Sequence, residues 1–481
     1  MPEVSGADRE KDHPGNAHAM NSEKHDSADE PWRRHPQAEA FCQQRLEECR
    51  AAIPPFATIA REISSRTGTR VFDWIDHFAL ADGRGVRKEL AAVGYAPDPA
   101  SDADGTWIHP GAILPRIALQ GAEAEEGGGA LRGVGLAAER LADFLAAWRI
   151  DSPVEGSPLA PLRRARIWSG DRIELAVIER TTSRGIAPRE VSPARTAAHL
   201  AAFERWRTRA RRAPEPGVEG ARAAMQATLR LARSLAEELG PDEAAWTAFA
   251  AERDYWQARN RAGRAQRACQ DALGLGWANH DHHTFRSSRE LFPLLLETLQ
   301  AFGFHARERF HAGAQAGWGA QVLEQPACRL AVFADVDLSP EEIAIDFRAA
   351  ELAPRETLGT VGLWCALHGE SLLDAGLHHL AVRADFSAFT RGLAGFGVSM
   401  MSPFSDFSFL KQAFTAGERW VVDPLRVERL PLTEGERARF AAQGAIGSHL
   451  ENIQRGEGFK GFNQTAVSDI IRRTDPRERG A

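Results

Sequence analysis

The sequence predicts an α+β fold in which two similar halves are joined by a helical connector. Short runs of alternating apolar and polar residues begin at Val71 and again at Gly276. Gly, Pro and Asp residues stand at the ends of these runs, as is typical of strands. Between these stretches, residues 190–274 are rich in Ala, Glu, Arg and Leu and poor in strand formers, which indicates helices. The expected divisions are a disordered tail (1–35), a first half (36–189), the helical connector (190–274) and a second half (275–481).

The composition is that of a globular protein that acts on small molecules. Its 481 residues are 43% hydrophobic and 26% charged, which excludes a disordered or fibrous chain. The net charge of −7 gives no reason to expect nucleic acid or an anionic membrane as a partner. No apolar run approaches the ~18–20 residues that span a bilayer, and no signal-peptide core is visible, so we expect a cytoplasmic protein.

The cysteines constrain the kind of metal site that the chain could hold. There are five, scattered along the chain without a CxxC pair. An odd number without such pairs disfavours both a disulfide framework and a thiolate zinc site. A bound metal should therefore have histidine and carboxylate ligands.

Helical segments are expected at both ends of the chain and in the connector. The polar tail, residues 1–35, has no apolar periodicity and is expected to be disordered. Helical periodicity is present over residues 36–66 and again over residues 461–473. The arginines of residues 205–212 could form a basic patch for nucleic acid, but the cluster is short and the rest of the chain is acidic. A solvated helix face is therefore the favoured interpretation.

The two strand-rich stretches repeat the same motifs in the same order, which indicates an internal duplication. Each half reads as a strand, a helix and further strands, twice over. The first half has FDWIDHFAL (72–80), Gly94-Tyr95, HPGAILPRIAL (109–119), GVGLAAERLADFLAA (133–147) and DRIELAVIER (171–180). The second half has NHDHHTFRS (279–287), Gly303-Phe304, EQPACRLAVFADV (324–336), GLHHLAVRADFSAFTRGLAGFGV (376–398) and GERWVVDPLRVERL (417–430).

Two copies of a His-x-x-x-Arg pattern stand out in the second half. Alternate side chains of a strand share a face, so His282 and Arg286 should point the same way. His379 and Arg383 form the same pattern in a second predicted strand. One such histidine is more often a hydrogen-bonded core residue than a ligand. Two copies in equivalent places favour a shared site.

A carboxylate could complete this site. Glu451 lies in a strand-like run, residues 447–456, before a Gly-rich turn. Two imidazoles and one carboxylate form the facial arrangement that holds divalent iron and leaves positions open for a 2-oxo acid and dioxygen. Glu451 could instead be an exposed strand carboxylate, and Glu428 competes for the same role.

A family resemblance distinguishes between these two carboxylates. The segment LENIQRGEGFKGFNQTAVSDIIRRTD (450–475) resembles the C-terminal signature of 4-hydroxyphenylpyruvate dioxygenase and its relatives, in which the strand's Glu binds iron. This resemblance implies that Glu451 is the ligand and that Glu428 lies on the preceding strand. Residues 376–398 resemble the segment that carries the family's second iron-binding histidine, which corresponds to His379.

The segment around His282 is similar to a second family. It resembles the 2-oxoadipate dioxygenase/decarboxylases, also called hydroxyglutarate synthases, in which a D-H-x-x-x-R strand supplies an iron-binding His and an Arg for the substrate carboxylate. Those roles correspond to His282 and Arg286. The 4-hydroxyphenylpyruvate enzymes lack that Arg, so Arg286 argues against identity with them. The resemblance covers about residues 276–475 and, more faintly, 70–185.

Both families belong to the vicinal-oxygen-chelate superfamily, which implies a fold of paired βαβββ units in two open barrels. The first half should be a non-catalytic duplicate. It keeps His77 in the place of His282, but Ala81 stands in the place of Arg286 and Gly135 in that of His379. Glu179 is a candidate for the former carboxylate position.

The expected activity is that of an Fe(II)-dependent dioxygenase that decarboxylates and hydroxylates a 2-oxo acid, with dioxygen as co-substrate. His282, His379 and Glu451 would bind the iron, and Arg286 would anchor a substrate carboxylate through two parallel hydrogen bonds. A metal-dependent isomerase or lyase of the same superfamily is the alternative. A protein that only binds a small molecule, with a vacant metal site, is a third.

Three further residues are expected near this site. Arg383 could bind a distal substrate carboxylate, although a surface salt bridge is the favoured use. His449 should line the pocket because it lies two residues before Glu451 on the same face. His283 should face away from the metal.

Overall fold

The structure is a computed structural model that describes residues 32–101, 105–124, 128–212, 217–311, 317–348, 352–355 and 357–477. The residues from Arg33 onward form one unit. Most of the expected disordered tail, residues 1–31, lies outside the described residues. None of the described helices is both long enough and apolar enough to cross a membrane.

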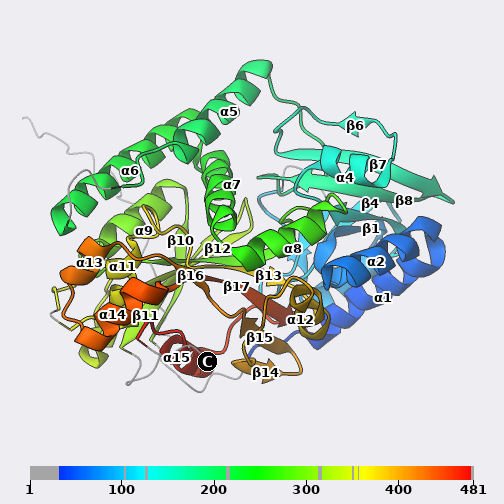
Figure 1. The fold of residues 1–481 in the computed structure, drawn as a ribbon. Helices are drawn as coiled ribbons and strands as arrows, with labels where there is room; N and C mark the ends of the chain where they lie inside the picture. The colour runs from blue at the N-terminus through cyan, green and yellow to red at the C-terminus, as the bar shows by residue number, and fades with distance from the viewer. Residues whose placement is uncertain are drawn as a thin grey trace, which may run out of the picture. The chain divides into compact units, whose positions relative to one another are not determined.

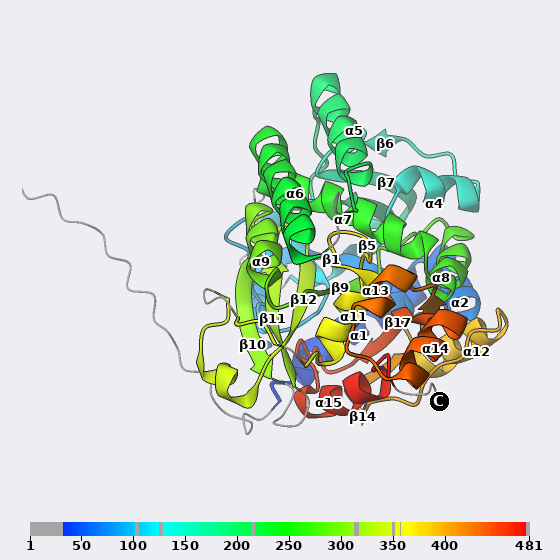
Figure 2. The ribbon, with the colours of Figure 1, turned by 60° about the vertical axis from the view of Figure 1, so that its left-hand side comes forward.

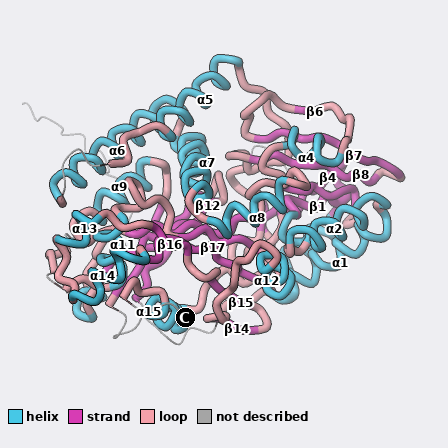
Figure 3. Tube along the Cα trace, in the orientation of Figure 1, coloured by secondary structure: helices cyan, strands magenta, loops and turns pink. Residues whose placement is uncertain are grey.

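Two mixed β-sheets form the framework, and Figure 3 shows their strands in magenta. The first has the strand order β2-β3-β4-β1-β5-β8-β7-β6, and the second has β10-β11-β12-β9-β13-β17-β15-β14, with β16 paired to β17. The strands of the first sheet are β1 (Ile75–Gly83), β2 (Ala96–Pro97), β3 (Thr106–Ile108), β4 (Arg116–Ala124), β5 (Leu131–Ala137), β6 (Val154–Glu155), β7 (Leu162–Gly170) and β8 (Ile173–Arg180). Those of the second are β9 (His280–Arg286), β10 (His305–His311), β11 (Trp318–Gln325), β12 (Leu330–Asp337), β13 (His379–Arg383), β14 (Ser405–Phe407), β15 (Leu410–Phe414), β16 (Glu418–Trp420) and β17 (Ala445–Arg455).

Each sheet consists of two βαβββ units, as the resemblance implied. In every unit a strand leads into a helix, further strands follow, and the first strand pairs in parallel with the last: β1 with β4, β5 with β8, β9 with β12 and β13 with β17. Three strands follow the helix in the first three units, and the fourth has β16 in addition. The helices of these units are α3 (Arg84–Ala92), α4 (Leu141–Trp148), α9 (Phe292–Ala301) and α12 (Phe386–Ala394). The predicted α+β class and the paired units are confirmed.

The remaining helices flank the sheets or join the halves (Figure 1). The first half begins with α1 (Pro36–Ala52), α2 (Pro54–Thr67) and the 3₁₀ turn η1 (Val71–Trp74). Residues 190–274 contain α5 (Pro193–Arg207), α6 (Val218–Leu239), α7 (Pro241–Ala258) and α8 (Arg261–Asp271). The second half adds η2 (Pro340–Ala344), α11 (Thr360–His368), α13 (Pro424–Glu428), α14 (Glu434–Gln443) and α15 (Gln464–Arg473).

Each half has its own hydrophobic core, and the connector belongs to the second. Phe78 and Ile117 are buried with α1 and α2 in the first half. In the second, Phe249 of α7 packs in one cluster with Phe285 of β9 and Val332 of β12. Figure 2 shows α5, α6 and α7 along the same side of the molecule as α9. Burial of their apolar faces against this sheet explains why the connector is ordered.

The sequence interpretation of the segment before β17 is wrong. Residues 417–430 were expected to be a strand, but β16 ends at Trp420 and α13 begins at Pro424. The Asp423 side chain accepts a hydrogen bond from the backbone N–H of Leu425, and proline at the first helical position favours a helix start. Glu428 therefore ends an exposed helix and does not lie on a strand beside the site.

The arginine cluster of the connector is only partly solvated. Glu252 of α7 is buried, and it lies 2.7 Å from Arg209 and 2.9 Å from Arg211. These two arginines are therefore internal ion-pair partners, and the expected solvated face is wrong for them. A sequence cannot reveal this pairing, because Glu252 lies on a different helix. The arginines of the predicted cluster that are exposed are Arg205, Arg207 and Arg212.

Candidate metal centre

Three adjacent central strands of the second sheet bring the predicted ligands together. β13 lies between β9 and β17, and each carries one ligand. Thr284 of β9 is opposite His379 of β13, and Ala381 of β13 is opposite Glu451 of β17. His282 is two residues before Thr284 on β9, so the alternation of side chains along a strand places both on the same face of the sheet.

The ligand atoms are close enough to bind one ion. His379 Nε2 lies 2.9 Å and His282 Nε2 lies 3.2 Å from the same oxygen, Glu451 Oε2. The two Nε2 atoms are 3.4 Å apart. All three side chains are buried, so water does not satisfy these groups. Two imidazoles and one carboxylate form a donor set that fits a divalent transition-metal ion.

Neighbouring polar groups orient His282 and Glu451, while the contact to His379 is with the nitrogen that faces the site. Asp281 Oδ1 lies 3.0 Å from His282 Nδ1, and a carboxylate can only accept, so Nδ1 carries the proton and Nε2 faces the site. Gln412 donates to Glu451 Oε1 at 3.0 Å, and Thr284 Oγ1 lies 2.7 Å from His379 Nε2. Sequence reasoning assigned no role to Asp281 or Gln412. The sequence did contain a signal for Asp281, because an Asp directly precedes the His in both halves.

The charges within the cluster favour replacement of a proton on His282 by a bound metal cation. Burial opposes a charge on His282, but Glu451 and Asp281 outweigh it and raise the pKa of the imidazole to about 9. Burial also acts to raise the pKa of Glu451, but the histidines lower it to about 2. The carboxylate is therefore charged at neutral pH. A divalent cation competes with the proton on His282 for the same electron pair.

A small cavity of about 50 Å³ adjoins the ligands. Aromatic side chains from β12, β15 and the loop before β14 form much of its wall, and α15 closes one side. The apolar lining limits water around the ligands. The lining includes Phe333, Asp335, Phe404, Phe414, Ile470 and Ile471.

Arg286 lies on β9 on the same side as His282, and its side chain is 1% exposed. None of its guanidinium nitrogens has a hydrogen-bond partner among the described residues. Its nearest carboxylate is Asp335, 3.8 Å away, and Asp335 rather than Arg286 lines the small cavity. Burial raises the pKa of Asp335 to about 7, although Arg286 opposes the shift. Arg286 is thus a buried cation without hydrogen bonds, beside a carboxylate in the cavity wall.

The other predicted residues lie around the centre rather than in it. His449 is buried, and its ring packs 5.1 Å from that of Phe414, but it lines neither this cavity nor the larger one between the halves. His283 packs against Phe249 on the opposite face of the sheet. Arg383 lines the larger cavity and is largely enclosed, so the expected surface salt bridge is wrong.

The pairing between strands shows which residue of the first half is equivalent to His379. Thr284 lies opposite His379, and its counterpart Ala79, two residues after His77, lies opposite Gly133. Gly133 therefore occupies the position of His379. The expected Gly135 is wrong by two residues, because pairing between strands sets this position and spacing along the chain does not.

The same shift applies to the carboxylate position. Ala381 is opposite Glu451, and the counterpart of Ala381, Gly135, is opposite Ala176. Ala176 therefore replaces the carboxylate ligand, and the expectation for Glu179 is wrong. Glu179 instead accepts a hydrogen bond from the backbone at the start of α4. Of the three ligand positions, the first half keeps only the histidine of β1.

Comparisons with known proteins show similarity to solved structures only. No protein-family model and no curated protein matches the chain. A mutant of 4-hydroxymandelate synthase from Streptomyces coelicolor is 11% identical over 84% of this chain and 96% of its own, with a TM-score of 0.26. The hydroxyglutarate synthase from Oryza sativa, in complex with 2-oxoadipate, is 13% identical over 55% of this chain and 98% of its own, with a TM-score of 0.32. A methylmalonyl-CoA epimerase from Mycobacterium tuberculosis is 13% identical over 37% of this chain and 89% of its own, with a TM-score of 0.21. Any assignment of a reaction therefore rests on the side chains of the site.

Proposed function

We propose that the protein is a non-haem Fe(II)-dependent dioxygenase that decarboxylates and hydroxylates a 2-oxo acid. The observation that carries this proposal is the buried His282, His379 and Glu451 cluster, with an Arg286 that has no hydrogen-bond partner near it. Fe(II), when bound, supplies the Lewis acidity and the electrons that this reaction with dioxygen requires. Three protein ligands leave further positions for substrate and dioxygen.

Arg286 supports a substrate with a carboxylate. A buried guanidinium without hydrogen bonds is costly, and a carboxylate that accepts two parallel hydrogen bonds offsets that cost. Arg286 lies two residues beyond Thr284, which contacts the ligand His379, so its charge is close to the ligands. Its role is to orient the substrate, since a guanidinium remains protonated and does not transfer a proton.

The wall of the cavity excludes water from the reacting groups. Phe333, Phe404 and Phe414 surround the ligands, and the apolar side chains of α15 cover them. A dry site strengthens the pairing of Arg286 with a carboxylate and prevents loss of reactive species to water. The proposed substrate is a 2-oxo acid of the 2-oxoadipate or the 4-hydroxyphenylpyruvate type. The cytoplasmic location and the absence of nucleic-acid and membrane partners stay predictions.

The test is oxygen-electrode uptake by the full-length protein loaded anaerobically with Fe(II). The panel of 2-oxo acids includes 2-oxoadipate and 4-hydroxyphenylpyruvate, and carbon dioxide release is measured in parallel. We expect one member of the panel to consume one dioxygen for each carbon dioxide released. His379→Ala should be inactive, while His77→Ala, which changes the duplicate half, should keep the activity.

The result also separates the alternatives. Bound metal without uptake on any 2-oxo acid would contradict the proposal and favour an isomerase or lyase. A protein that binds no divalent metal would favour a binding protein instead.

A further inference from the structure

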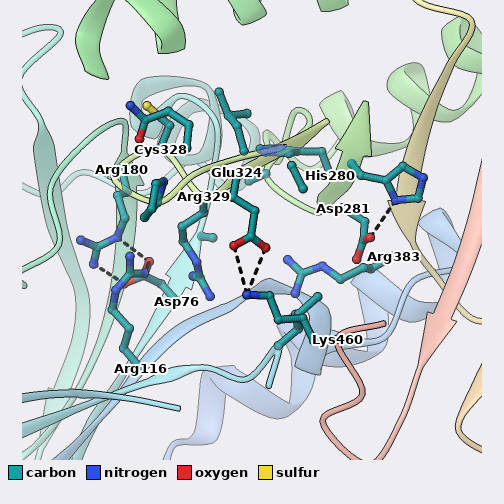
Figure 4. A pocket seen from close by; sticks show the side chains of 18 of the residues that line it. Asp76, Arg116, Arg180, His280, Asp281, Glu324, Cys328, Arg329, Arg383 and Lys460 are labelled. Atoms are coloured by element: carbon teal, nitrogen blue, oxygen red, sulfur yellow. Dashed lines mark hydrogen bonds and ion pairs between the residues drawn. The ribbon is translucent and has the colours of Figure 1, made fainter. Parts of the chain in front are cut away.

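A second, larger cavity lies between the two halves (Figure 4). Its volume is about 420 Å³, within the usual range for small-molecule sites. Both halves line it, from the ends of β8 and β17 and the starts of β1, β4 and β9. It touches His282 and Phe333, which also line the small cavity at the metal centre, but Glu451 and His379 do not reach it.

The lining of this cavity is strongly cationic. Nine arginine and lysine side chains line it, against five aspartates and glutamates. All five acids already have close cationic partners, and Glu139 pairs with Arg267. Asp76 pairs with Arg180, Asp98 with Arg184, Asp281 with Arg455, and Glu324 with both Arg307 and Lys460. Positive charge therefore remains in excess within the cavity.

Arg116 is a buried cation with few partners. The residue is 4% exposed, and its Nε and Nη1 atoms have no hydrogen-bond partner in the part of the chain that the structure describes. Asp76 Oδ1 lies 3.6 Å away, but Arg180 already donates to both oxygens of that carboxylate, at 2.8 and 2.6 Å. An enclosed charge that is neither hydrated nor hydrogen-bonded is unfavourable unless an anion joins it.

Arg329 reaches across the boundary between the halves. It belongs to the turn between β11 and β12 and has a left-handed backbone (φ 54°), which for a non-glycine residue is strained and is often found at functional sites. Its Nη2 atom makes only a long contact, 3.5 Å, with the carbonyl of Leu114 in the first half. Arg329 is exposed and lines the cavity, and desolvation by the surrounding protein lowers the pKa of its guanidinium to about 10.

Cationic groups occupy both sides of the cavity. Figure 4 shows Arg116 and Arg180 on one side, Arg383 on the other, and Arg329 and Lys460 in the space between them. The Nε atom of Arg383 is buried without a hydrogen-bond partner. A single small ion would contact only one of these sides. A ligand with anionic groups at both ends would contact both.

We propose that this cavity binds a small organic anion with two or more separated carboxylate or phosphate groups. Arg116 and Arg329 would hold one end, and Arg383 and Lys460 the other. The cavity shares His282 with the metal centre, but the four proposed anion contacts are not candidate metal ligands, so the inference does not depend on the proposed reaction. Carboxylate and phosphate share this recognition chemistry, and the test below distinguishes them.

The test is calorimetric titration of the full-length, iron-loaded protein without turnover. The probes are tricarballylate, a tricarboxylate, and fructose 1,6-bisphosphate, each at an ionic strength matched with sodium chloride. We expect one probe to bind and to raise the melting temperature. Arg329→Gln and Arg116→Gln should each weaken that binding by about 10- to 100-fold, the range expected for loss of one charge-assisted hydrogen bond.

Two control variants make the outcome decisive. Arg309 is an exposed arginine on β10 outside the cavity, so Arg309→Gln should bind the probe as wild type does. Arg286→Ala removes the proposed substrate arginine and should also bind it normally. No binding of either probe, equal binding by Arg329→Gln, or loss of binding in Arg286→Ala would overturn the proposal. Because no step of this assay requires turnover, anion binding and oxygen uptake can fail separately.

Discussion

Arg455 donates hydrogen bonds to both carboxylate oxygens of Asp281, at 2.8 and 2.9 Å, and Asp281 in turn accepts from the candidate ligand His282. Arg180 and Asp76 form the same pair beside His77 in the first half. The two halves therefore support the histidine in the same way. Only the second half has the other two candidate ligands, so there the pair orients a candidate metal ligand.

We expect Asp281→Asn to weaken binding of Fe(II) by about 10- to 100-fold, as is usual when a partner of a metal-bound histidine is changed. The reason is that Asp281 sets which nitrogen of His282 faces the site. The matched control is Asp76→Asn, which changes the equivalent pair in the first half and should leave iron affinity unchanged. Equal weakening in both variants, measured by competition with a metal indicator, would contradict the assignment.

Iron should bind once per chain, in the second half. His379→Ala removes a ligand and should lose most of the iron after gel filtration, whereas His77→Ala should retain it, because the first half has Gly133 and Ala176 at the other two ligand positions. Metal analysis of the purified variants measures this. Iron loss from His77→Ala comparable to that from His379→Ala would show that the first half takes part.

Glu451, not Glu428, should be the carboxylate ligand. Glu451 is 2% exposed and lies 2.9 Å from His379, while Glu428 ends an exposed helix. Glu451→Ala should abolish iron binding and activity while circular dichroism remains that of a folded protein. Glu428→Ala should match wild type in both measurements, and the opposite ranking would refute the metal centre.

Arg286→Ala should reduce kcat/KM for the 2-oxo acid while iron stays bound. The loss of a charged partner from a dry site costs about 2–5 kcal/mol, which corresponds to roughly 30- to several-thousand-fold. Arg286→Lys should recover part of it, because a lysine keeps the charge but not the two parallel hydrogen bonds. An Arg286→Ala variant as active as wild type would remove Arg286 from the substrate site.

Glu252→Gln should destabilise the fold by about 3–5 kcal/mol, because it leaves Arg209 and Arg211 without their buried partner. Glu238→Gln is the control, since its pair with Arg205 is exposed and should contribute less than about 1 kcal/mol. Urea unfolding at neutral pH measures both. Similar losses of unfolding free energy in the two variants would show that the burial of Glu252 does not increase its contribution to stability.

The same pair predicts a pH dependence. Burial acts to raise the pKa of Glu252, but Arg209 and Arg211 hold it below its ordinary value. Because the folded-state pKa is lowered, this stabilisation is present above the ordinary glutamate pKa, about 4.3, and is lost as the pH falls through the folded-state pKa. The difference in the free energy of unfolding between wild type and Glu252→Gln should therefore become smaller at acidic pH. A difference that stays constant down to pH 3 would contradict this account.

Features that depend on local geometry could be predicted from the sequence. Alternation along a strand placed His282, Thr284 and Arg286 on one face, and the repeated order of motifs predicted two halves of similar units. Both follow from the covalent geometry of the chain and from periodic burial, which neighbouring residues are sufficient to define.

Contacts between groups far apart in the chain could not be predicted from the sequence and became known from the packing of the elements. The pairing between strands shows that Gly133 and Ala176 are the first-half residues equivalent to His379 and Glu451. The segment that ends at Glu428 forms a helix, which the Asp423 side chain caps. The partners of Arg209 and Arg116, and the cavity between the halves, depend on how separate elements pack. Such contacts join residues far apart in the chain, and no spacing in a single sequence encodes them.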